Sequence, residues 1–177
     1  MKLKTIKIIP VFGIFALSFF LHFLYELFPN VLSSIFVPVN ESIWEHMKIL
    51  FTAIILYGII DYILLKKNNI KFNNFRFQLF FTGFISIVIY LILYLPLYKI
   101  FGEVMFISIS LMVVVYLVIS YISYKLLLSD DYGKINDISV YLVIVMYFVF
   151  TYLTYFPPHN YLFYDTLENK YGISEYK

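Results

Sequence analysis

The sequence predicts an all-α protein, a polytopic membrane helix bundle with about five transmembrane helices. Of its 177 residues, 62% are hydrophobic and only 14% are charged, which is typical of an integral membrane protein. Apolar stretches of about twenty residues, the length that crosses a bilayer as a helix, alternate with polar turns. We therefore expect one integral membrane domain over residues 1–177.

The composition also excludes several function classes. The chain has no cysteine, so disulfides and thiolate-bound metals are excluded, and any metal must bind nitrogen and oxygen donors. The formal net charge of +2 is too small for the basic surface of a nucleic-acid-binding protein. Membrane lipid is the partner that the composition indicates.

The elements follow from hydropathy and turn residues, taken in chain order. The first span, 8–28, is followed by Pro29 and Asn30, which end it. The apolar segment 31–39 is too short to cross the bilayer and is predicted to be an interfacial or re-entrant connection. The remaining spans and the tail are expected at 42–65, 77–100, 104–128, 138–156 and 157–177.

Basic residues predict the orientation, because loops rich in lysine and arginine stay cytoplasmic. With five spans and the N-terminus inside, nine of the thirteen basic residues lie on the inner side. The predicted topology is therefore N-in and C-out. The nine residues are Lys2, Lys4, Lys7, Lys66, Lys67, Lys71, Arg76, Lys125 and Lys134.

The stretch 38–48, PVNESIWEHMK, is unusually polar for this chain. Asn40 is a good N-cap, and Ser42 with Glu45 fits a capping box, so a helix is expected to start here. If it starts at Asn40, Glu41 and Glu45 lie four residues apart on one helical stripe. His22 and Glu26 have the same spacing at the end of the first span.

The predicted topology brings these residues and His159 of the tail to one outer face. Imidazole and carboxylate donors suit zinc, iron or manganese, and the tail could fold back over them. We expect a metal site among His22, Glu26, Glu45, His46 and His159. Glu41, Glu45 and His46 are the candidate catalytic residues. The alternative is ordinary helix capping by the glutamates and a polar histidine–glutamate pair at headgroup depth.

Two segments carry a family resemblance. Residues 38–48 and the ending 154–173, TYFPPHNYLFYDTLENKYGI, resemble an uncharacterised family of small bacterial multi-pass membrane proteins. Its pattern is PVNES followed by isoleucine or valine and then WEH. The resemblance implies a multi-pass protein of a bacterial plasma membrane, and it implies no activity.

Three functions remain open at this point. The first is a membrane enzyme whose outer site, metal-assisted, acts on a lipid or another amphiphile, with hydrolysis as the least specific reaction. The second is a small cation or metal transporter or channel subunit, with Asp61 marking the inward exit. That function requires a homo-oligomer, because few polar residues line the middle of the spans. The third is a non-catalytic membrane partner or sensor.

Overall fold

The computed structural model describes residues 3–173 of the chain. Lys2, one of the predicted inner basic residues, and residues 174–177, the end of the predicted tail, lie outside the described residues. The elements are α1 (Leu3–Ile6), α2 (Ile9–Leu27), α3 (Val31–Phe36), α4 (Ile43–Lys67), α5 (Phe75–Phe101), α6 (Met105–Leu128), α7 (Lys134–Tyr155), β1 (Tyr164–Asp165) and β2 (Lys170–Tyr171).

Within the described part of the chain, five helices are long and apolar enough to cross a membrane: α2, α4, α5, α6 and α7. The predicted all-α polytopic bundle is therefore confirmed, and most helix boundaries lie within two residues of those expected. The largest difference is α7, which begins at Lys134 rather than at residue 138. Its first turn is polar and carries Asn136, whose Oδ1 accepts from the backbone of Arg76 at 3.0 Å, so the helix extends into the loop.

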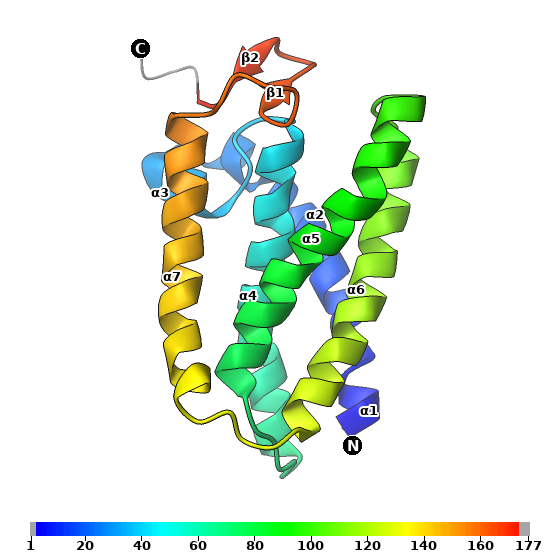
Figure 1. The fold of residues 1–177 in the computed structure, drawn as a ribbon, viewed down its shortest axis with the longest axis vertical. Helices are drawn as coiled ribbons and strands as arrows, with labels where there is room; N and C mark the ends of the chain where they lie inside the picture. The colour runs from blue at the N-terminus through cyan, green and yellow to red at the C-terminus, as the bar shows by residue number, and fades with distance from the viewer. Residues whose placement is uncertain (1–2, 174–177) are drawn as a thin grey trace.

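The helix α4 lies at the centre of the bundle, with α2 and α5 packed against it (Figure 1). It is the most buried of the five: 61% of its most apolar 18-residue stretch is buried inside the protein. Glycines allow close packing between α4 and its neighbours. A methyl group on Gly13 would lie 2.1 Å from the Tyr57 ring, and one on Gly83 would lie 2.8 Å from the Phe51 ring.

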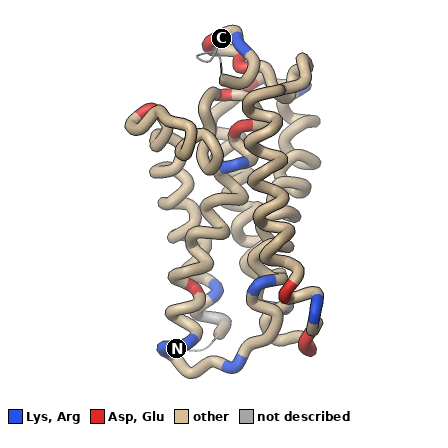
Figure 2. Tube along the Cα trace, turned by 90° about the vertical axis from the view of Figure 1, so that its left-hand side faces the viewer, with Lys and Arg blue, Asp and Glu red and all other residues tan. Residues whose placement is uncertain are grey.

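The bundle has two distinct ends (Figure 1). At one end, called here the N-terminal end, lie α1 and the turns that follow α4 and α6. At the other, called here the tail end, lie α3, the start of α4 and the segment after α7. Figure 2 shows lysine and arginine residues mainly at the N-terminal end, as the predicted orientation requires. The orientation itself stays a prediction.

The segment between the first two spans contains the short helix α3. Asn30 and Ser33 form its capping box: Asn30 Oδ1 accepts from Ser33 N at 3.0 Å, and Ser33 Oγ accepts from Asn30 N at 3.2 Å. The helix packs against α7, where Ser34 Oγ lies 3.0 Å from the Tyr155 hydroxyl. This agrees with a short connecting element that does not cross the bundle.

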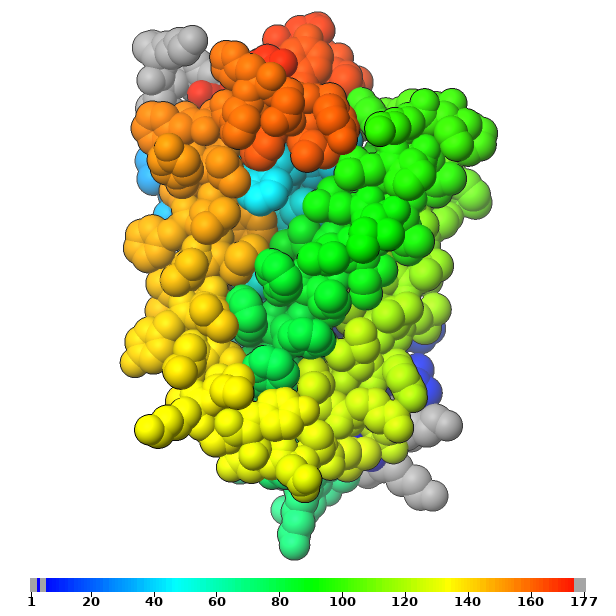
Figure 3. Space-filling view, viewed as in Figure 1, coloured from blue at the N-terminus to red at the C-terminus, as the bar shows by residue number. Residues whose placement is uncertain are grey.

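The described part of the tail folds back over the end of the bundle (Figure 3). Strands β1 and β2 form a small antiparallel hairpin, which the sequence did not predict. Main-chain bonds fix the tail: Trp44 N donates to Leu162 O at 2.8 Å, and Ile173 N donates to Thr154 O at 3.2 Å. Gly172 has a φ of +56°, and a methyl group there would lie 2.3 Å from Thr154 O. Only glycine fits this closing turn.

Candidate metal site

The start of α4 decides which side chains face each other. Ser42 is the N-cap, and its Oγ accepts from Glu45 N at 3.3 Å. Asn40 forms the preceding turn, in which its Oδ1 accepts from Ser42 N at 2.9 Å. Of the two caps that the sequence offers, Ser42 is therefore the one used, and α4 begins at Ile43, one residue after the start expected for the second span. Glu41 lies before the helix, so it shares no helical stripe with Glu45.

Because Glu41 lies before α4, its side chain lies close to two histidines, His22 and His46. Glu41 Oε2 lies 3.4 Å from His46 Nε2 and 3.8 Å from His22 Nε2. The donor atoms of the three residues all lie within 4.8 Å of one another, and each side chain is half-buried. Among the described residues, this is the one group of three or more histidine and acidic side chains close enough to hold a metal ion. We call it the HEH cluster.

The imidazole of His46 is oriented by the backbone. His46 Nδ1 lies 2.9 Å from Ser42 O, so Nδ1 donates a hydrogen bond to that carbonyl and Nε2 is the ring nitrogen that faces Glu41. Metal-bound histidines commonly have this arrangement. The His22 ring is held by stacking on Phe23, with ring centroids 4.9 Å apart. The side-chain hydrogen bond with His46 lowers the pKa of the Glu41 carboxyl below its usual value, which keeps it ionised as a ligand must be.

The tail fixes the backbone of Glu41. The carboxylate of Asp165 is fully buried, and its Oδ2 accepts from Glu41 N at 3.0 Å. Its other oxygen accepts from the backbone of Leu167 at 2.8 Å and Glu168 at 3.0 Å. One side chain of the tail therefore ties the hairpin to the HEH cluster. No local pattern in the sequence predicts this role of Asp165, because only the fold brings residues 124 positions apart together.

His22 and Glu41 of the HEH cluster line a cleft of about 540 Å³ between the end of α2, the loop before α4 and the hairpin. Glu26 is exposed and lines this cleft one helical turn from His22. It is outside the HEH cluster, although the spacing had grouped the two residues as ligands. Glu168 also lines the cleft and forms an ion pair with Lys170.

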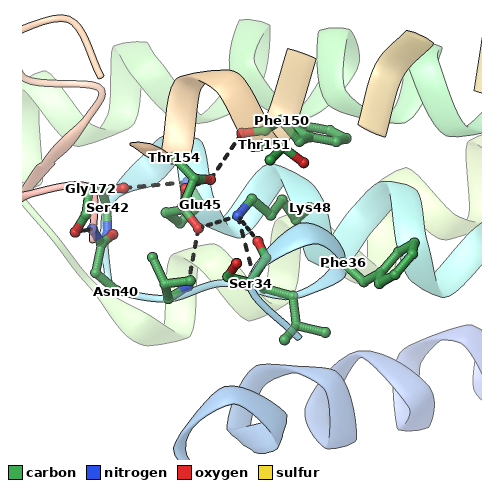
Figure 4. Close-up of polar contacts among 12 residues, drawn as sticks. Ser34, Phe36, Asn40, Ser42, Glu45, Lys48, Phe150, Thr151, Thr154 and Gly172 are labelled. Atoms are coloured by element: carbon green, nitrogen blue, oxygen red, sulfur yellow. Dashed lines mark hydrogen bonds and ion pairs between the residues drawn. The ribbon is translucent and has the colours of Figure 1, made fainter. Parts of the chain in front are cut away.

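Glu45 lies outside the HEH cluster, in a buried ion pair with Lys48 (Figure 4). Its Oε2 lies 2.7 Å from Lys48 Nζ and accepts from Val39 N at 3.1 Å. Its Oε1 accepts from Thr154 Oγ1 at 2.7 Å. Lys48 Nζ also donates to Ser34 O at 2.8 Å. This network joins α3, α4 and α7. Glu45 was predicted as a ligand and a catalytic residue, and in this structure its contacts are those of an anchor.

His159 is not part of the HEH cluster either. It lies at the exit of α7, exposed, and stacks on Tyr171 with ring centroids 4.5 Å apart. The structure thus brings together two of the predicted metal ligands, His22 and His46. The third member of the cluster is Glu41, which the sequence marked as catalytic. The predicted roles of the individual residues stay predictions.

Comparison with known proteins places the chain in a family. The sequence model of a family of unknown function (DUF6512) matches residues 1–173. The chain belongs to this family. The predicted membership of an uncharacterised family is confirmed, and the match extends far beyond the two motifs that suggested it. Searches of curated proteins and of solved structures find no match.

Proposed function

We propose that the tail end of this multi-pass membrane protein binds one divalent metal ion through His22, Glu41 and His46. The mutual distances in the HEH cluster carry this proposal. In a tetrahedral zinc site with bonds of about 2.0 Å, ligand atoms lie about 3.3 Å apart. The distances from Glu41 Oε2 to the two imidazoles, 3.4 and 3.8 Å, approach this value. Two imidazoles and one carboxylate suit zinc first, and iron or manganese next.

The function proposed on this site is metal-assisted hydrolysis of a lipid or another amphiphile. Three protein ligands leave a fourth position for water, whose pKa a bound zinc ion lowers to near 7. The cleft provides the opening to that position. Glu26 is the carboxylate of the cleft that we assign as general base, because it is exposed and outside the cluster. Glu45 holds the loop that carries Glu41.

We propose that the tail end faces the outside of a bacterial plasma membrane and that the N-terminal end lies in the cytoplasm. Lysine and arginine gather mainly at the N-terminal end (Figure 2), and basic residues stay on the cytoplasmic side. A lipid of the outer leaflet would then reach the cleft from the side. The exposed apolar residues Leu27, Phe28 and Val31 near its edge support access from the bilayer.

Zinc titration of the detergent-purified, metal-free protein tests the site. We expect one zinc ion per chain, and an affinity at least about tenfold lower in His22→Ala, Glu41→Gln and His46→Ala, since each removes a ligand. His159→Ala is the matched control, because it removes the remaining histidine and leaves the HEH cluster intact. Absence of zinc binding, or equal losses in His159→Ala, would refute the metal site.

Hydrolysis is tested separately with vesicles of phosphatidylethanolamine and phosphatidylglycerol. The zinc-loaded protein is expected to release lipid products detectable by mass spectrometry, and metal removal is expected to stop their formation. Glu26→Gln should bind zinc as the wild type does and lose product formation, because it removes the base and no ligand. Zinc binding without any product would contradict hydrolysis of these lipids and favour a metal-dependent partner or sensor.

A further inference from the structure

A second polar centre lies at the N-terminal end, remote from the HEH cluster. Lys7, just before α2, forms an ion pair with Asp61 of α4 through Asp61 Oδ2. Both residues are buried, with exposed fractions of 4% and 3%. A buried charge pair in a membrane bundle is costly and commonly marks a functional position. The proposed hydrolysis uses neither residue.

A small cavity of about 20 Å³ adjoins this ion pair. Three polar atoms of its lining residues have no hydrogen-bond partner among the described residues: Asp61 Oδ1, Gln78 Oε1 and Ser123 Oγ. Their residues are at most 5% exposed. Buried polar atoms are nearly always paired, so three unpaired ones around one cavity indicate a missing ligand. The volume suits a single water molecule or an ion of similar size.

The donors around the cavity favour a small cation. The unpaired atoms are a carboxylate oxygen, an amide oxygen and a hydroxyl oxygen, which are hard donors of the kind that small alkali and alkaline-earth ions bind. A single carboxylate, that of Asp61, faces the cavity. It balances one positive charge, so the site suits a monovalent ion rather than a divalent one.

Lys7 occupies the position of that charge in this structure. It lies between α1, a helix of four residues, and α2, and its backbone oxygen accepts from Ser120 Oγ. Lys7 and Ser120 line both the cavity and a neighbouring open groove of about 410 Å³ between α2 and α6. Lys7 therefore belongs to the lining that the cavity and the groove share.

We propose that this cavity is a site for one monovalent cation of sodium size, which exchanges against the proton of Lys7. In the exchange, the Lys7 ammonium releases its proton to solvent and becomes a neutral amine. The cation takes its place beside Asp61 and contacts the oxygens of Gln78 and Ser123. One positive charge leaves and one enters, so the net charge of the site does not change.

The surroundings of Lys7 favour such an exchange. Burial lowers the pKa of the Lys7 ammonium below its usual value, although the charge of Asp61 opposes this. The other titratable group lining the cavity is Tyr57 of α4. The elements α2, α5 and α6 contribute uncharged side chains to the lining, and Lys125 of α6 lies in the neighbouring groove over the Tyr121 ring.

Thermal unfolding of the whole protein in detergent tests this site, with sodium chloride compared with choline chloride at equal ionic strength. Sodium should raise the melting temperature, and the sodium concentration needed for half the effect should fall by up to about tenfold per pH unit between about pH 7 and pH 9. Lys7→Gln should respond at lower sodium concentrations and equally at both pH values, because no ammonium competes. Asp61→Asn should not respond.

Two further variants keep the test decisive. Asp137→Asn is the control, because Asp137 pairs with Arg76 at an exposed position and its loss should leave the sodium response unchanged. Gln78→Leu keeps the ion pair and removes one oxygen, so it should weaken the response even if Asp61→Asn does not fold. Equal melting temperatures in sodium and choline, in wild type and in Lys7→Gln, would show that the cavity holds only water and would overturn the proposal. A full sodium response in Asp61→Asn would overturn it as well.

Discussion

Replacing Lys48 by methionine tests whether the buried ion pair with Glu45 holds the tail end together. Glu45 is 1% exposed and Lys48 is fully buried. The change removes the ammonium 2.7 Å from Glu45 Oε2 and the bond from Lys48 Nζ to Ser34 O. Two neutral donors, Val39 N and Thr154 Oγ1, remain on the carboxylate. Methionine fills most of the lysine stem's volume, so the charge is the main loss.

The expected cost follows from that geometry. Removing one partner of a buried ion pair costs about 3–5 kcal/mol, because the remaining charge stays desolvated without compensation. The double variant Glu45→Gln with Lys48→Met removes both charges and keeps an acceptor for Thr154, so it should cost only about 1–2 kcal/mol. The double variant is therefore expected to be more stable than Lys48→Met alone. Such non-additivity is the signature of a direct pair.

The free energy of unfolding in detergent, measured by denaturant titration, gives these values. Lys99→Met is the control, because Lys99 is exposed near the end of α5 and its loss should change stability by about 0.5 kcal/mol or less. A Lys48→Met variant as stable as this control, or a double variant less stable than Lys48→Met, would refute the reasoning. Zinc titration of the double variant also tests Glu45 as a ligand: unchanged affinity would exclude that role.

Three further predictions concern the tail and Lys7. Asp165→Asn should lower zinc affinity by about tenfold or more, because it weakens the acceptor that positions Glu41; zinc titration beside Glu168→Gln checks this. Gly172→Ala should speed hydrogen exchange in residues 160–173, because a methyl group would meet Thr154 O; unchanged protection would contradict it. In choline chloride, wild-type stability relative to Lys7→Met should rise with pH. Since burial lowers the pKa of Lys7 below 10.5, the unfolded chain binds more protons between the two pKa values, and the slope there is at most about 1.4 kcal/mol per pH unit. The prediction would be contradicted if the difference in free energy of unfolding between wild type and Lys7→Met stayed constant or fell with rising pH up to about pH 10.5.

Hydropathy was sufficient to predict the spans, because a helix in lipid needs a continuous apolar run whatever its neighbours are. It could not predict that α4 is central. Asn40 and Ser42 are equally good caps in isolation, so the sequence left the N-cap of α4 open. Ser42 takes that place in the structure, where Asn40 Nδ2 instead donates to Gly172 O at 3.0 Å. That contact joins residues 132 positions apart.

The candidate site was predicted as a set of residues and not as an arrangement. His22 and His46 were identified because histidines are scarce in this chain. The separation of Glu41 from Glu45 follows from the helix start. The Glu45–Lys48 spacing of three residues suits an ion pair, but its burial depends on α3 and α7. The contact between Lys7 and Asp61 has no local signal, since no periodicity relates positions 54 residues apart.

The role of Asp165 has a consequence for biosynthesis. The cluster residues lie on α2 and just before and within α4, which are made early, whereas the carboxylate that fixes the Glu41 backbone follows α7 and is made late. Because chains are synthesised and fold from the N-terminus, the three donors can reach their final geometry only after all five spans have been inserted. If the HEH cluster binds metal as proposed, a half-made chain would contain its three residues and still bind metal weakly. Metal loading would thus distinguish finished molecules from unfinished ones.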